Sequence, residues 1–149
     1  DMIAAYGDAD LTCYRAESPV ELVQRQAQEW DPLLDWAANR YGVRLFVGEG
    51  VMHIPQTSDG QARLAQELQS LSAFQLAAAH DLISLSGSLV IGLATMAEHI
   101  EPAEGWRLSR IDEDWQAEQW GQDDDANAQA AIKEAAFHDA ARFYRIALT

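Results

Sequence analysis

Cysteine and basic residues are both scarce in this sequence. Its single cysteine, Cys13, excludes an internal disulfide and fits a reducing compartment. Ten Lys and Arg residues stand against 24 Asp and Glu residues, which gives a formal net charge of −14. Such a chain lacks the positive footprint that nucleic acid or an anionic membrane surface requires. We therefore expect no nucleic-acid partner.

Long apolar runs are also missing. The most apolar stretch, LISLSGSLVIGLATMA at 82–97, is interrupted by serine and glycine and is short for a membrane span. We therefore expect no membrane insertion, and we interpret this stretch as buried helix.

The residues that are present favour one globular domain. Of the 149 residues, 48% are hydrophobic and five are tryptophan, enough to build a sizeable core. Only 23% are charged, which argues against intrinsic disorder. We expect residues 1–149 to form a single helical domain and to be a monomer.

Helix signals dominate the chain. Asp31 and Pro32 are typical of a helix start, and Gly42 of a helix end. Caps and apolar periodicity place the predicted helices at 19–29, 32–41, 58–70, 72–83, 87–99 and 102–120, with a last one following Asp123. The sequence therefore predicts a mainly α fold, an orthogonal or irregular bundle of about six to seven helices.

One segment, VRLFVGEGVMHI at 43–54, is strand-like. Val43, Leu45 and Val47 alternate with other residues, and a Gly-Glu-Gly turn follows at 48–50. We predict a short β-hairpin near 43–54, which must pack on helices because an isolated hairpin is marginal.

The last predicted helix carries an apolar row. Ile132, Ala136, Ala140, Phe143 and Ala147 recur at helical spacing. We expect this row to face the core.

The segment DEDWQAEQWGQDDD, at 112–125, raises the question of function. It holds seven carboxylates and two tryptophans in fourteen residues. A calcium EF-hand loop needs a central glycine, which the run DDDANAQAAIKE lacks. The four histidines, His53, His80, His99 and His138, are not paired at the spacing of a helical zinc motif. We therefore predict neither a metal site nor a cofactor.

Catalysis by the same acids is the main alternative. Asp112, Glu113 and Glu118, together with His138, would be the residues of a small metal-dependent or hydrolytic enzyme. Such chemistry needs one group desolvated in a cleft, and so polar a run is typical of a solvated surface. A general acidic protein-interaction module is a further alternative.

The two tryptophans of the segment differ in their position on the helix. Leu108, Ile111 and Trp115 are three and four residues apart, so we predict that Trp115 faces the core. Trp120 lies about 140° around the helix from Trp115 and does not continue that row. It either covers Gly121 at the helix end or stays exposed, as interface tryptophans do.

Several motifs together carry a family resemblance. WDPLLDWA (30–37), GSLVIGLA (87–94) and IDEDWQAEQWGQDDDA (111–126) occur in this order. The most specific pattern is D-E-x-W-Q-x-x-x-W-G, formed by Asp112, Glu113, Trp115, Gln116, Trp120 and Gly121, and it is supported by Tyr14-Arg15 and Trp30-Asp31-Pro32. With these motifs the chain resembles the ATP-twelve family from residue 11 to residue 148. Members of this family are assembly chaperones for the alpha subunit of F-type ATP synthase in mitochondria and alphaproteobacteria.

The resemblance implies a two-part chaperone, with a small β-rich N-terminal domain and a helical C-terminal domain. This chain resembles the helical domain, and a start at Asp1 agrees with a missing β domain. The resemblance further implies that the protein is not an enzyme and that it binds the free alpha subunit, preventing its aggregation before it meets the beta subunit.

By resemblance, Glu113 is the acid associated with this role. Asp112, Gln116, Glu118 and Trp120 are the other candidate partner-binding residues. The implied location is the cytoplasm of an alphaproteobacterium or the mitochondrial matrix of a eukaryote.

Overall fold

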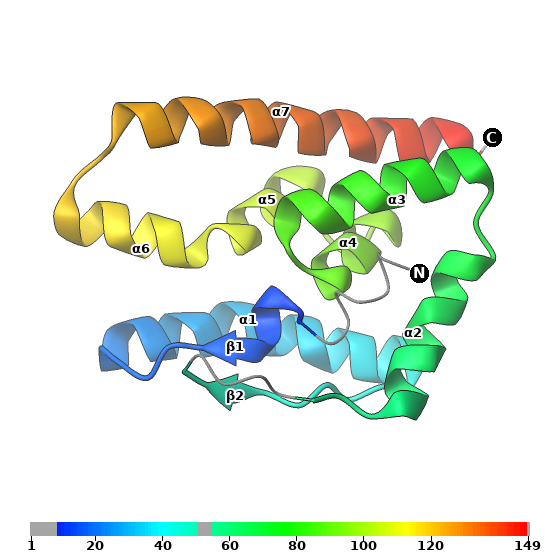
Figure 1. The fold of residues 1–149 in the computed structure, drawn as a ribbon, viewed down its shortest axis with the longest axis horizontal. Coiled ribbons are helices and arrows are strands. Elements are labelled where there is room, and N and C mark those ends of the chain that lie inside the picture. Colours follow the sequence, from blue (N-terminus) through cyan, green and yellow to red (C-terminus); the bar gives the residue numbers. More distant parts are fainter. Residues whose placement is uncertain (1–8, 51–54, 149) are drawn as a thin grey trace.

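A computed structural model describes residues 9–50 and 55–148 and confirms a mainly α fold (Figure 1). Its helices are α1 (Val20–Tyr41), α2 (Ser58–Gln69), α3 (Ala73–Ser86), α4 (Leu89–Met96), α5 (Pro102–Ser109), α6 (Ile111–Trp120) and α7 (Asp124–Ala147). A 3-10 turn at Leu11–Cys13 precedes β1 (Tyr14–Arg15), which pairs with β2 (Gly48–Glu49). The seven α-helices of the described residues agree with the six to seven predicted.

The shortest apolar helix, α4, lies at the centre of the bundle. Every residue from Leu89 to Thr95 is buried, as expected for a helix that is apolar on all sides. α7 runs along one side of the molecule and α1 along the other, with α3, α4 and α5 between them (Figure 1). Gly92 lets α3 approach α4 closely, because a Cβ at this position would lie 2.6 Å from Ile83 Cγ1. Across residues 9–50 and 55–148, we find no helix with the length and apolar character of a membrane span.

The first helix departs from the prediction at Pro32. A break was predicted there, but α1 continues through it from Val20 to Tyr41. Asp31 does not cap a helix and instead pairs with Arg15, with 2.9 Å from Oδ1 to Nη1. An internal proline costs a helix about 3 kcal/mol. Burial of Trp30, Leu33, Leu34 and Ala37 on both sides of the proline offsets this cost.

The predicted helix 102–120 is in fact two helices. α5 and α6 are separated at Arg110, whose backbone is not helical (φ −112°, ψ 13°). The Ser109 hydroxyl donates to the Trp106 carbonyl at this point (2.6 Å). Because the chain bends here, Trp106 of α5 and Ile111 of α6 both pack into the core.

The hairpin prediction is wrong for the residues that the structure describes, and 51–54 lie outside them. β2 pairs with β1, far away in sequence, and the pairing is parallel. Residues 43–47 form no strand. The Gln56 side chain bonds both the N–H and the carbonyl of Phe46 (2.8 and 2.9 Å), in place of a partner strand.

The other helix boundaries lie close to their predicted positions because their signals are local. Ser72 caps α3 in a capping box, and Gly87 ends α3 in the left-handed region (φ 73°). Asp123 caps α7, its carboxylate accepting from the N–H groups of Asp125 and Ala126 (3.0 and 3.2 Å).

The apolar row predicted for the last helix reaches the core only at Ala140. Ile132 and Phe143 are 65% and 41% exposed. α7 also buries Phe137, which is not in the row, and its ring packs against Trp106 with 5.9 Å between centroids. Apolar residues occur on more than one side of α7, so spacing alone did not determine which side is buried.

Candidate functional site

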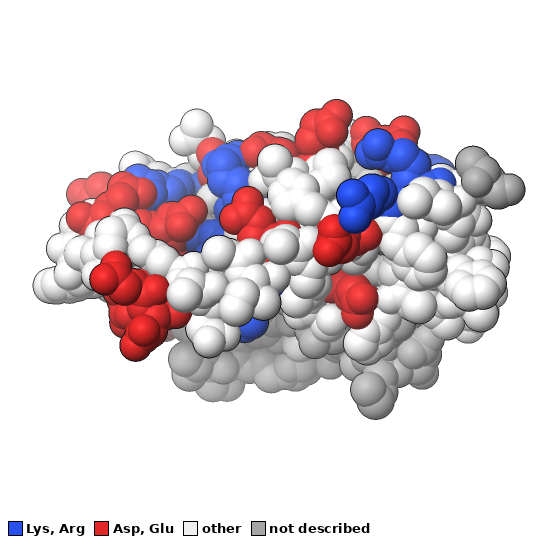
Figure 2. Space-filling model, turned by 90° about the horizontal axis from the view of Figure 1, so that it is seen from above, with Lys and Arg blue, Asp and Glu red and all other residues white. Residues whose placement is uncertain are grey.

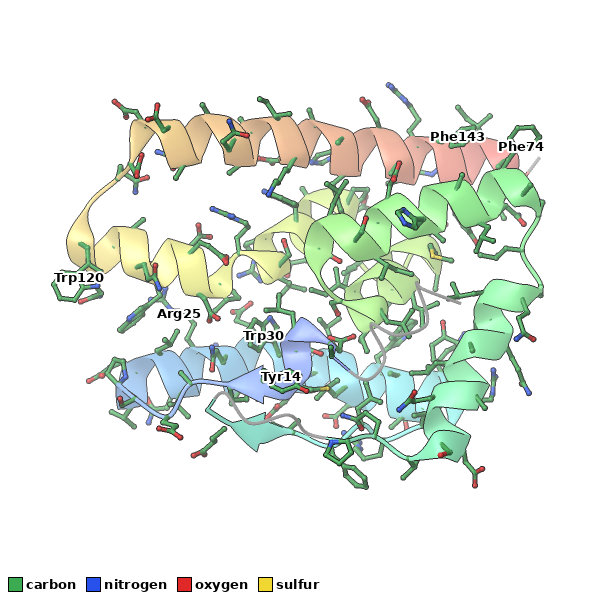
Figure 3. All side chains as sticks on the ribbon, viewed as in Figure 1. Tyr14, Arg25, Trp30, Phe74, Trp120 and Phe143 are labelled. Carbon is green, nitrogen blue, oxygen red and sulfur yellow. The ribbon has the colours of Figure 1, made fainter. Side chains whose placement is uncertain are left out.

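Two side chains of α1 fix the acidic helix α6 in place. Arg25 donates two hydrogen bonds to the Glu118 carboxylate (2.6 and 3.0 Å). Its guanidinium also lies over the Trp115 ring, 4.9 Å from the centroid. In Figure 3, Arg25 extends from α1 toward α6. Glu118 and Trp115 therefore face the neighbouring helix.

Asp112 is held by a second, more buried contact. The buried Gln26 side chain donates from Nε2 to Asp112 Oδ1 (2.5 Å) and accepts at Oε1 from the Ala16 N–H (2.8 Å). One amide thus ties α6 to the segment before α1. The position of Asp112 indicates a structural role in the folded chain.

Trp115 is not the core residue that its spacing predicted. It is only partly buried, and Ile111 is the one residue of α6 that is buried. The bend at Arg110 explains the difference, because α6 leaves the core after its first turn. Trp115 lies between α1 and α6, with the Arg25 guanidinium over its ring.

The sequence left two positions open for Trp120, one over Gly121 and one exposed to solvent. The structure shows the exposed one. Trp120 is 86% exposed, and Figure 3 shows it projecting from the end of α6. Gly121 ends the helix with a positive φ of 96°, a conformation that a side chain rarely adopts. Because so much of the Trp120 ring is exposed, it does not pack over the helix end.

Glu113, Gln116 and Trp120 are spaced three and four residues apart and share one side of α6. All three are exposed. Glu113 lies near Arg110, 4.0 Å from Oε2 to Nη1. Partial burial raises the pKa of Glu113, Asp112 raises it further, and Arg110 lowers it. This side of α6 is exposed, as are Asp114 and Gln119 elsewhere on the helix.

The surface between α1 and α6 carries more acidic than basic side chains. A hollow of about 450 Å³ lies there, and its charged lining residues are Glu21, Arg25, Glu29, Arg107, Asp114 and Glu118. Both arginines are already paired, Arg25 with Glu118 and Arg107 with Glu29 and Glu104. Figure 2 shows acids at the end of the molecule where α6 and the start of α7 lie, with basic side chains beside them and further acids along the rest of this face.

The residues of the enzymatic alternative do not form one site. Asp112 is bound to Gln26 and Glu118 to Arg25, whereas His138 lies beside Glu134 on α7 (3.8 Å). Within 9–50 and 55–148, no three His, Cys, Asp or Glu side chains form a group that could hold a metal ion.

Arg25 and Gln26 are the site residues that sequence reasoning missed. They lie 93 and 86 residues from their partners Glu118 and Asp112. No spacing rule connects positions this far apart, so only the fold identifies them.

Comparison with known proteins gives consistent results. The family described as ATP12 chaperone protein matches residues 1–38. The mitochondrial protein atp12 of Schizosaccharomyces pombe is 26% identical over 122 residues, which is 78% of this chain and 42% of that protein.

Two solved structures share the fold over nearly the whole chain. The Atp12 crystal structure from Paracoccus denitrificans matches with a TM-score of 0.96 and 45% identity, covering 98% of this chain and 63% of that one. A protein of Agrobacterium tumefaciens matches with a TM-score of 0.92 and 40% identity, covering 99% of this chain and 55% of that one. The chain thus spans about half the length of the relatives it matches.

Proposed function

The chain belongs to the ATP12 chaperone family, and from this premise we propose that it binds the free alpha subunit of F-type ATP synthase before alpha meets the beta subunit. The family relationship is the observation that carries the proposal. A chaperone name denotes no enzyme function, in agreement with the prediction that the protein is not an enzyme.

The proposed activity requires only reversible binding. An unassembled subunit exposes apolar surface that is normally covered by its neighbours, and such surface drives aggregation. A protein that covers it lowers the concentration of aggregation-prone subunit without consuming ATP. The contact has to stay weak enough for the beta subunit to displace it.

The outward side of α6 supports this role. Trp120 offers a large exposed ring of the kind that contributes most to protein interfaces. The acids around it would attract and orient a basic surface on the client. We propose that Glu113, Gln116 and Trp120 touch the alpha subunit, while Asp112 and Glu118 hold α6 in position.

The compartment would follow from the source, the mitochondrial matrix in a eukaryote or the cytoplasm in an alphaproteobacterium. Relatives of both kinds, mitochondrial and bacterial, support this.

Charge reversal at Glu113 tests the proposal. We expect Glu113→Lys to weaken binding of the isolated alpha subunit at least about tenfold, because the new cation faces the basic surface of the client. Binding is measured by pull-down and biolayer interferometry, and folding by circular dichroism and thermal melting.

Glu49→Lys is the matched control, since Glu49 is exposed on β2, on the other side of α1 from α6 (Figure 1). It should bind like wild type. Loss of helicity in Glu113→Lys would make Glu113 structural. Equal binding by both variants would contradict a role for α6.

A further inference from the structure

One side of α7 is exposed along its length in the part of the chain that the structure describes. Asp125, Gln129, Ile132, Ala136, Asp139 and Phe143 are spaced alternately four and three residues apart, and we call this row the α7 seam. Every member of the row is exposed. A 4-3 spacing that includes apolar residues is the pattern with which one helix packs lengthwise on another.

The apolar part of the seam is substantial. Ile132 is 65% exposed and Phe143 is 41% exposed. Phe74 at the start of α3, 68% exposed, extends the patch, with 6.3 Å between its ring centroid and that of Phe143. Figure 3 shows the two phenylalanines side by side at the end of α7. Large apolar side chains grouped in this way mark interaction surfaces.

The first half of α7 is exposed on nearly all sides. From Asp124 to Ala136, Ala130 is the only residue of the helix that is even partly buried. High alanine content explains why such a half-helix stays folded without packing. It does not explain Ile132, a β-branched residue with lower helix propensity, at an exposed position.

The charges of the seam indicate the chemistry of its partner. Asp125 and Asp139 belong to the row, and no lysine or arginine does. Asp139 pairs with Arg142 on the same helix (3.0 Å), but the pair is exposed and such pairs are weak. Covering the row would desolvate both carboxylates, so the partner must supply basic groups opposite them.

A second copy of this chain does not meet that requirement. Its seam has the same two aspartates and the same lack of bases, and each copy carries a net charge of −14. Two such surfaces repel each other.

We propose that the α7 seam docks an amphipathic helix of the client, with apolar side chains against Ile132, Ala136 and Phe143 and Lys or Arg opposite Asp125 and Asp139. The seam covers eighteen residue steps, or about 27 Å, the length of a five-turn helix. It lies on a different helix from the α6 contact. The identity of the client rests on the proposed function, whereas the chemistry of its helix rests on the seam alone.

A pair of synthetic peptides tests the chemistry without the alpha subunit. One is a nineteen-residue helix former with leucine at 4-3 spacing and lysine at the two positions facing the aspartates. The other has glutamate at those two positions. We expect the lysine peptide to bind the chain at least about tenfold more tightly, measured by fluorescence anisotropy of a labelled peptide.

A matched pair of variants locates the binding. Ala136→Lys puts bulk and a positive charge in the seam, whereas Ala131→Lys makes the same change at an exposed position about a third of a turn away. Alanine and lysine are both good helix formers, so both variants should fold. We expect Ala136→Lys to lower binding of the lysine peptide and of the alpha subunit about tenfold, and Ala131→Lys to change either less than twofold.

Three results would overturn the seam proposal: equal binding of the two peptides, equal effects of the two variants, or a wild-type dimer in light scattering that Ala136→Lys dissociates. If the chain discriminates between the two peptides but does not bind the alpha subunit, the proposed function is contradicted and the seam proposal is not. If alpha binds but the peptides do not discriminate, only the seam proposal fails.

Discussion

Asp10 is a buried carboxylate that accepts hydrogen bonds from neutral donors. It accepts from the Thr12 N–H and hydroxyl (2.9 and 2.7 Å), the Ser88 hydroxyl (2.7 Å) and the Val90 N–H (2.9 Å). The last two contacts lie at the start of α4, where the helix dipole favours negative charge. One side chain thus fastens the N-terminal segment to the central helix.

Replacing this carboxylate should reveal a pH-dependent contribution to stability. Burial raises the pKa of Asp10 above 3.8, although its hydrogen bonds oppose the shift. A group whose pKa is higher in the folded state contributes stability below its unfolded pKa and loses it as pH rises through the folded pKa. We therefore expect the free energy of unfolding of wild type, relative to Asp10→Asn, to fall as pH rises above about 4.

Urea unfolding of both proteins at a series of pH values measures this difference. Because asparagine does not titrate, the pH dependence of all other groups cancels in the comparison. A difference that stays constant with pH would show that Asp10 has an ordinary pKa, and a difference that grows with pH would show that the pKa is lowered.

Residue roles within the acidic segment were only partly predictable. Spacing correctly separated Trp115 from Trp120, because the helical period fixes relative direction. Spacing did not predict what Trp115 contacts. The chain bends at Arg110, and the side of α6 that carries Trp115 therefore faces α1. Direction relative to the core depends on tertiary packing, and a local pattern does not contain it.

At the scale of elements, local signals predicted where most helices begin and end, and long-range contacts account for the errors. Caps such as Ser72 and Asp123 act within a few residues of themselves. The helix through Pro32 and the parallel β1–β2 pair depend on segments distant in sequence. α7 combines both cases, because its cap was predicted and its buried side was not.

The contact between α1 and α6 can be tested as a unit. We expect Arg25→Ala to loosen α6, because it removes both hydrogen bonds to Glu118 and the cover over Trp115. Amide hydrogen exchange in α6 should become several-fold faster, since local opening of a weakly packed element is governed by such contacts. The melting temperature should change by less than about 4 °C, because the pair is exposed.

Arg44→Ala provides the comparison, since Arg44 forms an exposed ion pair with Asp35 (2.8 Å) away from α6. Exchange in α6 should be unaffected by this variant. If Arg25→Ala also leaves α6 exchange unchanged, the Gln26–Asp112 bond is sufficient to hold the helix.

For the molecule as a whole, charge is distributed unevenly. Between Arg110 and Lys133 the sequence has seven acids and no base, and the acids lie at the end of the molecule formed by α6 and the start of α7 (Figure 2). The field of such a group of acids acts over roughly 8–10 Å at moderate ionic strength. It speeds and orients the approach of a basic partner more than it strengthens the final complex.

Salt should therefore act mainly on the association rate. We expect the rate constant for binding the alpha subunit to fall about tenfold between about 0.05 and 0.5 M NaCl, with a smaller change in dissociation. Surface plasmon resonance over this range measures both. Glu113→Gln should flatten the salt dependence because it removes one steering charge, and Glu49→Gln, on the other side of α1, should leave it unchanged. An association rate independent of salt would mean that Trp120 and other apolar side chains bind the client without electrostatic steering.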